Sequence, residues 1–395
     1  MESEIKVPGF LANGINCGIK EDGRRDLALI FSTRKATAAG VFTRNAFKAA
    51  PVLLDMERIV RGEGQAIIVN SGVANAATGE EGLRDAKAMT AAVSKTLKIS
   101  DDLVYVASTG VIGRQVPVHK VEKAMPDLVA GLDEDGLPAA EEAIMTTDKM
   151  PKLAVAKAAI NGRDVTVCGL AKGAGMIEPN MATMLSFILT DAVIERNTLD
   201  KLFRSAINKS FNSITVDGCM STNDTVLILA NGQAGGSAIT GVKNTGLFGK
   251  MLSQVLSELS YLMVKDGEGA TKVIEIVVKE ARNHLEARKI AYAVANSNLV
   301  KTAFYGKDPN WGRIIGAIGT VNENIPVNAV RVDFNDTTIF ADGCGVRGNE
   351  KKLLEIMELA RIRVSIHMGM GRKTFRLLAS DLTHEYVTIN AHYTT

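Results

Sequence analysis

The stretch "AKGAGMIEPNMATMLSFILTDA", residues 171–192, leads from a glycine-rich turn through a proline and a threonine into an apolar run. That run, "TMLSFILTD" (183–191), has the pattern of a buried strand, and "RDVTVCGLA" (163–171) before the turn has the pattern of another. Glycine and proline are typical of the turns between such elements. The stretch therefore predicts two strands joined by a loop, with Lys172 and Thr183 at the ends of that loop.

Length and composition set the class of protein. A chain of 395 residues is too long for one ordinary core, so we expect two subdomains or one large layered domain. Hydrophobic residues make up 46% of the chain, which is enough for a sizeable core. The 46 basic and 44 acidic side chains leave a net charge of +2, so neither nucleic acid nor a membrane surface is expected as a partner.

Cysteine and histidine spacing gives no sign of a metal site. The four cysteines lie far apart without a C-x-x-C pair, and the five histidines are scattered. The first residues, "MESEIKVPGF", lack the apolar run of a signal peptide, and no stretch reaches the ~18 apolar residues of a membrane span. We therefore expect a cytoplasmic protein with reduced thiols and no bound metal.

Strand and helix patterns are mixed along the chain. Strands are predicted, from short β-rich runs between turn residues, over 26–32, 37–43, 65–72, 104–109, 271–281, 361–368, 373–380 and 385–393, with a hairpin over 329–343 that turns at Asn335-Asp336. Helices are predicted over 83–98, 197–212 with Asn197 as the N-cap, 247–265 and 285–297. Because a regular βαβ rhythm is lacking, these patterns favour an α+β fold with helices packed on mostly antiparallel sheets.

The loop after residue 171 has three interpretations from its residues alone. The pattern by itself favours a plain surface loop, in which Gly173 and Gly175 supply positive φ angles and residues 179–180 form a turn. A phosphate-binding loop fits poorly, because the lysine precedes the glycines and no helix start follows. The third interpretation is a self-cleavage site, at which the hydroxyl of Thr183 attacks the carbonyl of Ala182.

Self-cleavage would turn a weak nucleophile into a useful one. A threonine hydroxyl needs a base beside it. An N-terminal threonine carries its own base, since an α-amino group has a pKa near ~8. Ala182 is small, glycine and proline allow unusual backbone geometry before it, and the β-branched side chain of Thr183 is stiff.

The segment "KGAGMIEPNMATML" (172–185) resembles the processing motif of the ornithine acetyltransferases of arginine biosynthesis, also called glutamate N-acetyltransferases. Further segments resemble that family in its order and cover essentially the whole chain. They are "GIKEDGRRDLALI", "AGVFTRNAFKAAPV", "VNSGVANAATG", "STGVIGR", "IMTTDKMPK", "FNSITVDGCMSTNDTV", "KDGEGATK", "SNLVKTAFYGKDPNWGRI" and "TINAHYTT". Two positions depart from the pattern of many relatives, Ala77 in place of cysteine and Cys219 in place of an acidic residue.

The resemblance implies a cut between Ala182 and Thr183 that leaves residues 1–182 as one chain and 183–395 as a second, beginning with the nucleophile. Both would share one intertwined catalytic unit, a sandwich of sheets between helical layers. The expected assembly is an α2β2 heterotetramer of the processed chains.

The same resemblance implies the roles of the other site residues. Thr109 and the backbone N–H of Gly110 would form the oxyanion hole, whereas a strand exit is the ordinary reason for Thr-Gly. Substrate would contact the side chains of Thr146, Lys172, Thr183, Glu268, Asn390 and Thr395. Thr146 is favoured over Thr147 only narrowly, Lys172 could instead be an ordinary surface lysine, and Glu268 could simply belong to a turn after a helix.

The implied reaction is acetyl transfer from N2-acetyl-L-ornithine to L-glutamate through an acetyl-Thr183 intermediate. No bound cofactor is implied, and acetyl-CoA is a possible second donor, since some members of the family use it. A related self-cleaving aminopeptidase or amidase would pass the acyl group to water instead. A non-enzymatic amino-acid-binding protein would keep the Ala182–Thr183 bond. The segments "KDPNWGR" and "VDGCMSTND" have no assigned role.

Overall fold

The computed structural model describes residues 5–178, 184–321 and 324–392. Its larger sheet has the strand order β4-β3-β2-β9-β7-β6-β5, with β1 paired to β2. The strands are β1 (Phe10–Ile15), β2 (Leu27–Phe42), β3 (Glu63–Val73), β4 (Val104–Val111), β5 (Leu153–Ile160), β6 (Arg163–Lys172), β7 (Leu185–Thr190) and β9 (Thr225–Ala230). Among the described helices, none is long and apolar enough to cross a membrane.

This sheet folds back on itself to make a layered sandwich. Strand β2 has 16 residues, and its register against β3 shifts between Phe31 and Ala36, where the sheet bends. One apolar cluster fills the space between the two halves of the sheet, with Ile67 and Val69 from β3 facing Phe187 and Leu189 from β7. The short helix α4 (Leu137–Ile144) closes one end of that space through its buried alanines and leucine.

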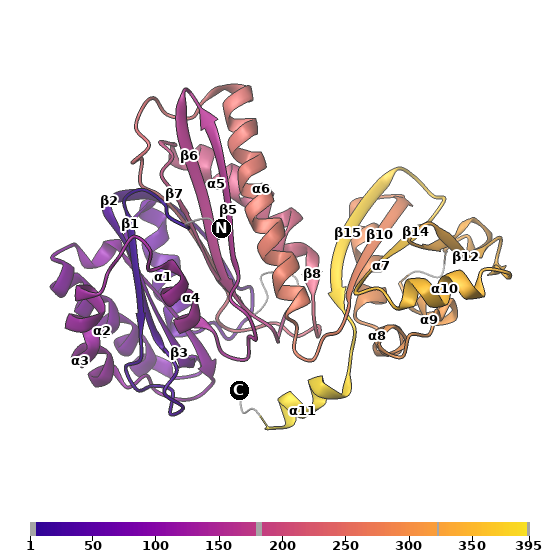
Figure 1. The fold of residues 1–395 in the computed structure, drawn as a ribbon, viewed down its shortest axis with the longest axis horizontal. Coiled ribbons are helices and arrows are strands. Elements are labelled where there is room, and N and C mark those ends of the chain that lie inside the picture. The colour runs from indigo at the N-terminus through magenta and orange to yellow at the C-terminus, as the bar shows by residue number, and fades with distance from the viewer. Residues whose placement is uncertain (1–4, 179–183, 322–323, 393–395) are drawn as a thin grey trace.

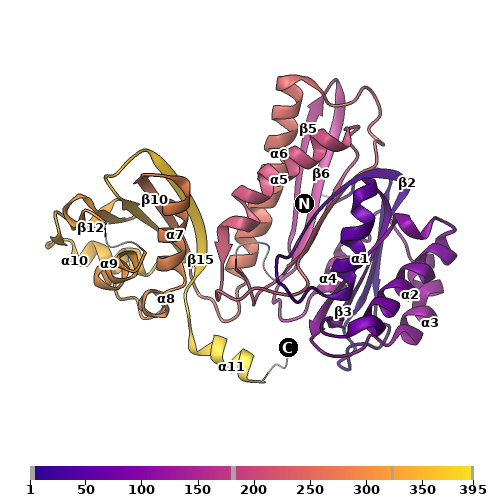
Figure 2. The same ribbon diagram turned by 180° about the vertical axis from the view of Figure 1, so that it is seen from behind.

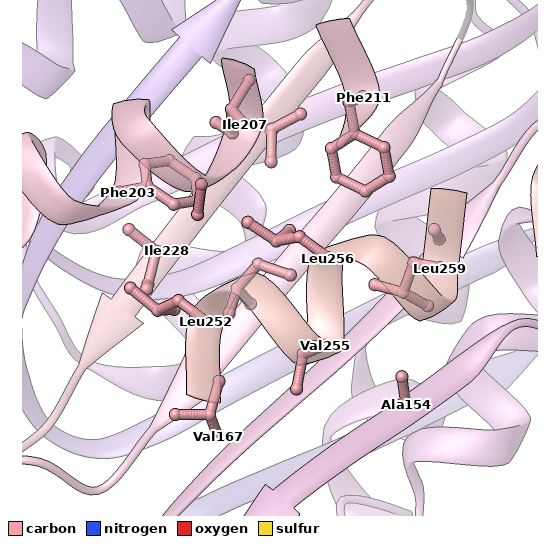
Figure 3. Close-up of a cluster of buried hydrophobic side chains, with 14 of the residues drawn as sticks. Ala154, Val167, Phe203, Ile207, Phe211, Ile228, Leu252, Val255, Leu256 and Leu259 are labelled. Carbon is pink, nitrogen blue, oxygen red and sulfur yellow. The ribbon is translucent and has the colours of Figure 1, made fainter. Parts of the chain in front are cut away.

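Helices cover both outer faces of the sandwich (Figures 1 and 2). On the β2–β4 half these are α1 (Ala50–Arg58), α2 (Gly79–Leu97) and α3 (Val118–Ala130), and on the other half α5 (Arg196–Lys209) and α6 (Gly241–Lys265). The apolar side chains of α6 recur at helical spacing, with Leu252, Val255, Leu256 and Leu259 all buried. Figure 3 shows them packed against α5 and the strands below.

The second sheet has the order β13-β12-β11-β14-β10-β15-β8. Its strands are β8 (Ile214–Thr215), β10 (Val273–Ala281), β11 (Arg331–Phe334), β12 (Thr337–Ala341), β13 (Cys344–Gly345), β14 (Arg361–His367) and β15 (Lys373–Ser380). The helices that follow in the chain are α7 (His284–Ala295), α8 (Asn298–Tyr305), α9 (Trp311–Gly319), α10 (Glu350–Met357) and α11 (His384–His392). After β15, α11 runs back toward the larger sheet (Figure 1).

Strand order mixes the two halves of the chain. Strands β7 and β9 come after residue 183, yet they lie between β2 and β6, which come before it. β7 is antiparallel to β6 and parallel to β9. The residues on the two sides of the Ala182–Thr183 bond therefore share one sheet and one core.

The mixed α/β class with mostly antiparallel pairing is confirmed. Among the described strands, the parallel pairs are β3–β4, β7–β9, β10–β14 and β8–β15. The hairpin turn at Asn335-Asp336 is also confirmed, and Asn335 has a φ of 49°, in the left-handed region that asparagine tolerates. The two runs at 26–32 and 37–43 are one continuous strand, β2.

Two other predictions are wrong. Residues 385–393 were expected to form a strand, but 384–392 form helix α11. Their β-branched residues favour a strand, yet α11 has no buried residue and pairs with no described strand, so nothing holds the run extended. Asn197 is not the N-cap of α5, because Glu195 occupies that position and no side chain caps the helix.

Candidate active site

A cavity opens where β4 and β6 end, beside the turn after α6 and helix α11. It encloses about 590 Å³ including its open mouth. Most of the predicted site residues line it, namely Thr109, Gly110, Thr146, Lys172, Glu268 and Asn390, together with Thr147. Ala182, Thr183 and Thr395 lie outside the described residues, so only their chain neighbours can be placed.

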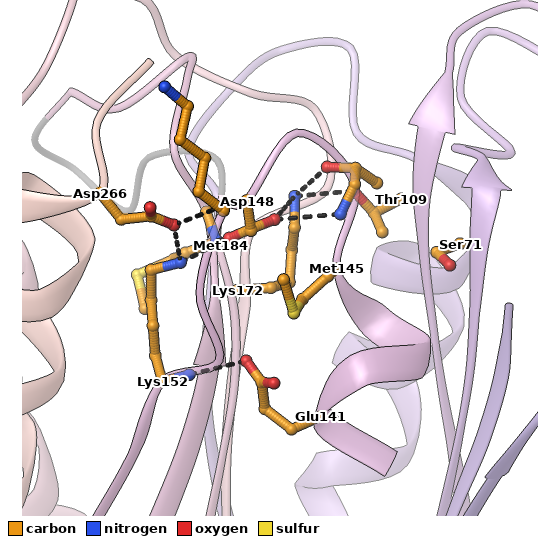
Figure 4. A network of polar contacts seen from close by, with 12 residues as sticks. Ser71, Thr109, Glu141, Met145, Asp148, Lys152, Lys172, Met184 and Asp266 are labelled. Carbon is orange, nitrogen blue, oxygen red and sulfur yellow. Dashed lines mark hydrogen bonds and ion pairs between the residues drawn. The ribbon is translucent and has the colours of Figure 1, made fainter. Parts of the chain in front are cut away.

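Lys172 lies at the end of β6 and is almost fully buried, which rules out an ordinary surface lysine. Its Nζ atom donates hydrogen bonds to the hydroxyl of Thr146 at 2.9 Å and to that of Thr109 at 3.4 Å, and lies 3.8 Å from a carboxylate oxygen of Asp148 (Figure 4). Burial lowers the pKa of Lys172, although the carboxylates of Asp148 and Glu268 oppose that shift. The residue brings one cation to two hydroxyl groups.

Thr109 and Gly110 lie at the end of β4 beside β3. Gly110 has a φ of 132°, and a Cβ there would lie 2.3 Å from the carbonyl carbon of Gly72. Only glycine fits this close approach of two backbones. Because the Oγ1 atom of Thr109 accepts a hydrogen bond from Lys172, its own proton is available to another acceptor in the cavity.

Glu268 follows the end of α6, as a turn residue would, but its side chain enters the cavity. Its backbone N–H donates to the carbonyl of Ala174 at 2.9 Å, and its Oε2 atom accepts from Nδ2 of Asn390 at 2.8 Å. Gly175 allows this arrangement, because a Cβ there would lie 2.5 Å from the carboxyl group of Glu268. Three distant segments therefore meet at one carboxylate.

A buried ion-pair network supports the cavity from behind, and no sequence pattern predicts it. Nζ of Lys152 lies 2.8 Å from Asp148 and 2.6 Å from Asp266, and all three side chains are buried. Asp148 also accepts from the N–H groups of Thr146 at 3.0 Å and Gly173 at 2.6 Å. The segment "IMTTDKMPK" held both Asp148 and Lys152, but the partner Asp266 is 114 residues away from Lys152.

The pKa of Asp148 depends on this network. Burial alone would raise it, but the charges of Lys172 and Lys152 hold it well below its usual range. Asp148 is therefore a fixed anion that orients Lys172 and holds the loop that begins at Gly173. Within the described part of the chain, the neighbouring Glu141 has no cation at hydrogen-bond distance, and burial raises its pKa to about 8.

The unassigned segment "VDGCMSTND" shapes the loop before residue 179. Asp217 accepts hydrogen bonds from the N–H groups of Met176 at 2.6 Å and Ile177 at 2.9 Å. Asn223 donates to the carbonyls of Ala74 at 2.6 Å and Ser108 at 2.7 Å. These contacts tie residues from both sides of the Ala182–Thr183 bond together.

The other unassigned segment does not reach the cavity. Asn310 caps α9 by accepting from the N–H of Arg313, and Trp311 packs on Phe340 with ring centroids 5.3 Å apart. Neither residue lines the cavity. Among the described residues, no group of three histidine, cysteine or acidic side chains could hold a metal ion.

A comparison with known protein families identifies the family to which this chain belongs. The ArgJ family model matches residues 11–395. The chain belongs to the ArgJ family. The arginine biosynthesis bifunctional protein ArgJ of Geobacter sulfurreducens is 46% identical, over 99% of this chain and 100% of that protein. The protein of the same name from Caldanaerobacter subterraneus subsp. tengcongensis is 45% identical, over 100% of this chain and 99% of that protein.

A solved structure also matches part of the chain. The crystal structure of arginine biosynthesis bifunctional protein ArgJ from Bacillus halodurans has 44% identity and a TM-score of 0.43. The match covers 45% of this chain and 92% of that chain.

Proposed function

We propose that this ArgJ family member transfers an acetyl group from N2-acetyl-L-ornithine to L-glutamate, giving L-ornithine and N-acetyl-L-glutamate. The observation that carries the proposal is the cavity itself. It combines a buried cation, Lys172, with a carboxylate, Glu268, and with the hydroxyl of Thr109. A cation suits the carboxylate of an amino acid, and a carboxylate suits an ammonium group.

Thr183 is the nucleophile, and it becomes the first residue of the second chain when the bond after Ala182 is cut. Its hydroxyl attacks the acetyl carbonyl while its α-amine accepts the proton. The hydroxyl of Thr109 and the N–H of Gly110 stabilise the oxyanion. The amine then protonates the departing ornithine, and glutamate attacks the acetyl-threonine ester.

Lys172 and Glu268 bind the amino-acid part of each substrate, with Thr146 and Asn390 beside them. Lys172 donates to Thr146 and Asn390 donates to Glu268, so each hydroxyl or amide orients its charged partner. Thr395, the last residue of the chain, completes the site. Because donor and acceptor use one site in turn, the kinetics are ping-pong.

The two chains, 1–182 and 183–395, assemble as an α2β2 heterotetramer in the cytoplasm, and no bound cofactor or metal takes part. Acetyl-CoA is a second acetyl donor. The support for this second activity is that the relatives of 45–46% identity are named bifunctional proteins.

The test uses N2-acetylornithine labelled in the acetyl group and measures which products receive the label. With glutamate present, label should appear in N-acetylglutamate in a one-to-one ratio with ornithine, and Thr183→Ala should abolish this transfer. Label released as acetate would identify an amidase or aminopeptidase type of reaction. Binding without turnover by an uncut chain would identify an amino-acid-binding protein.

A further inference from the structure

The loop between β1 and β2, residues 16–26, is held in one shape by a buried carboxylate. Asp26, the last residue of this loop, is fully buried. Its side chain accepts hydrogen bonds from the backbone N–H groups of Cys17 at 2.6 Å, Ile19 at 2.6 Å and Lys20 at 2.8 Å. Because one carboxylate satisfies three backbone donors, it fixes the backbone from which the Lys20 side chain extends.

The Lys20 side chain reaches the segment that follows α4. Its Nζ atom donates hydrogen bonds to the carbonyl of Arg25 at 2.9 Å and to the carbonyl of Met145 at 2.7 Å. From the same loop, the guanidinium group of Arg24 donates to the carbonyl of Thr146 at 3.1 Å. The carbonyls of Met145 and Thr146 belong to the peptide groups before and after the α-carbon of Thr146. Two cations of one loop therefore hold the backbone of Thr146.

The other polar groups of Thr146 are also paired. Its N–H donates to the carboxylate of Asp148 at 3.0 Å, and its hydroxyl accepts from Nζ of Lys172 at 2.9 Å. Every polar group of this residue therefore has a charged partner. A threonine with a fixed backbone presents its hydroxyl in a defined position, because its β-branched side chain is stiff. The position of the Lys172 ammonium group in the cavity depends on that hydroxyl.

We propose that Lys20 and Arg24 are positioning residues for acetyl transfer, which hold Thr146 so that its hydroxyl fixes the ammonium group of Lys172 in the cavity. The inference rests on the proposed function, because it assumes that Lys172 binds the amino-acid part of both substrates. Neither Lys20 nor Arg24 lines the cavity. Both act through Thr146 and not by touching substrate.

A second contact places Lys20 beside the strands that carry the oxyanion hole. Gly72 on β3 pairs with Gly110 on β4. A Cβ at Gly72 would lie 3.3 Å from Cγ of Lys20, and the φ of Gly72 is 100°, in the region that favours glycine. Gly72 therefore leaves room for the stem of Lys20. The same side chain contacts both the strand pair of Gly110 and the segment of Thr146.

The charges around Lys20 make its position costly. Burial and, to a smaller extent, the positive charges of Arg24 and Lys172 lower its pKa to about 8. The carboxylates of Asp26 and Asp22 oppose this shift only in part. An ammonium group that served only to anchor a surface loop would gain nothing from lying near a second cation. Its placement is explained if it holds the segment that orients Lys172.

Lys120 provides a matched control on the same loop. It lies on α3 and, like Lys20, is half-buried. Its Nζ atom donates to the carbonyl of Gly18, so it also anchors the loop through a hydrogen bond from a lysine to a carbonyl. Lys120 differs in that its partner lies within the loop and not beside Thr146.

The experiment is a double-mutant cycle measured by steady-state acetyl transfer from N2-acetylornithine to glutamate. Lys20→Met should raise KM for both amino acids and lower kcat/KM by about 10- to 100-fold, because a small displacement of a binding group is costly. Thr146→Val should cause a loss of similar size. The double variant should lie within about threefold of Thr146→Val, because Lys20 acts through that hydroxyl. Lys20→Arg should recover part of the loss, and Lys120→Met should keep the wild-type kcat/KM.

Losses that multiply in the double variant, or wild-type kinetics in Lys20→Met, would overturn the inference and leave the proposed function intact. A fall in kcat with KM unchanged would indicate a loss of folded enzyme and would also contradict it. A wild-type protein that transfers no acetyl group would remove the proposed function, and the inference with it.

If Lys20→Met does not fold, Arg24→Met takes its place in the same cycle, since the side chain of Arg24 is exposed. A loss of kcat/KM that disappears in the Thr146→Val background supports the inference. A loss that persists in that background, or no loss at all, contradicts it.

Discussion

The side-chain amide of Asn390 donates a hydrogen bond of 2.8 Å to the carboxylate of Glu268. This contact joins helix α11 to the turn after α6, across 122 residues of sequence. Tyr386, one turn earlier on α11, also donates a hydrogen bond of 3.3 Å to Asp217. Helix α11 therefore contributes Asn390 to the lining of the cavity, although no residue of α11 itself is buried.

Gly175→Ala should impair substrate binding through Glu268. The new Cβ would lie 2.5 Å from the Glu268 carboxyl carbon, so that side chain must move. Losing a charge-assisted hydrogen bond costs about 1.5–3 kcal/mol, which predicts a fall in kcat/KM of roughly 10- to 150-fold. Steady-state kinetics with acetylornithine and glutamate measure this fall in kcat/KM. Gly246→Ala on α6 is the control, because a Cβ there meets nothing within 4 Å.

Lys172→Met should raise KM for both amino-acid substrates and lower kcat/KM by about 10- to 100-fold, because in the proposed reaction this one buried cation binds donor and acceptor in turn. Its control is Lys149→Met, which alters an exposed side chain on the neighbouring loop. Matching losses in both variants would mean that the effect comes from general charge and not from the site.

Lys152→Met should lower the free energy of unfolding by about 3–5 kcal/mol, because it leaves the buried Asp148 and Asp266 without their shared cation. Denaturant unfolding measures this change. Lys307→Met removes an ion pair with Glu358 in which both side chains are more than half exposed, and its cost should be far smaller because water screens exposed charges. A similar small cost for Lys152→Met would show that the buried network adds little stability.

Glu141 predicts a pH dependence of stability. Its pKa is raised by burial from 4.5 to about 8, so the folded state binds more protons than the unfolded state between these values. The stability it contributes is fully present below pH 4.5 and is lost as pH rises toward 8. Glu141→Gln should remove a fall on the order of 5 kcal/mol across this range. If the free energy of unfolding changes with pH in the same way in wild type and in Glu141→Gln, the buried Glu141 is not the source of the pH dependence.

Sequence patterns predicted the elements with strong periodicity. The helix expected over 247–265 lies within α6, and the strand expected over 271–281 matches β10 to within two residues. Strands β5 and β9 were missed, although both are buried parts of the larger sheet. Short apolar runs of this kind do not distinguish a strand from a buried helix.

Site residues could be predicted from the sequence where they belong to a recognisable motif. Thr109, Lys172 and Glu268 come from separate motifs, and the structure places all three at one cavity. The burial of Asp148 and Asp224 was not predictable, because their partners lie in distant parts of the sequence or depend on how β7 meets β9. The residues of a motif can be identified from the sequence, but the burial of a charged side chain and its ion-pair partners depend on the folded structure.

The most direct test of the account is the intact mass of the purified protein after incubation with N2-acetylornithine in the absence of glutamate. Cleavage before Thr183 predicts two pieces of roughly 19 and 23 kDa from the 42.1 kDa chain. The larger piece begins Thr-Met-Leu-Ser and gains the mass of one acetyl group, which added glutamate removes. A single uncut chain, or a processed chain that never carries acetyl, would contradict the central role of Thr183.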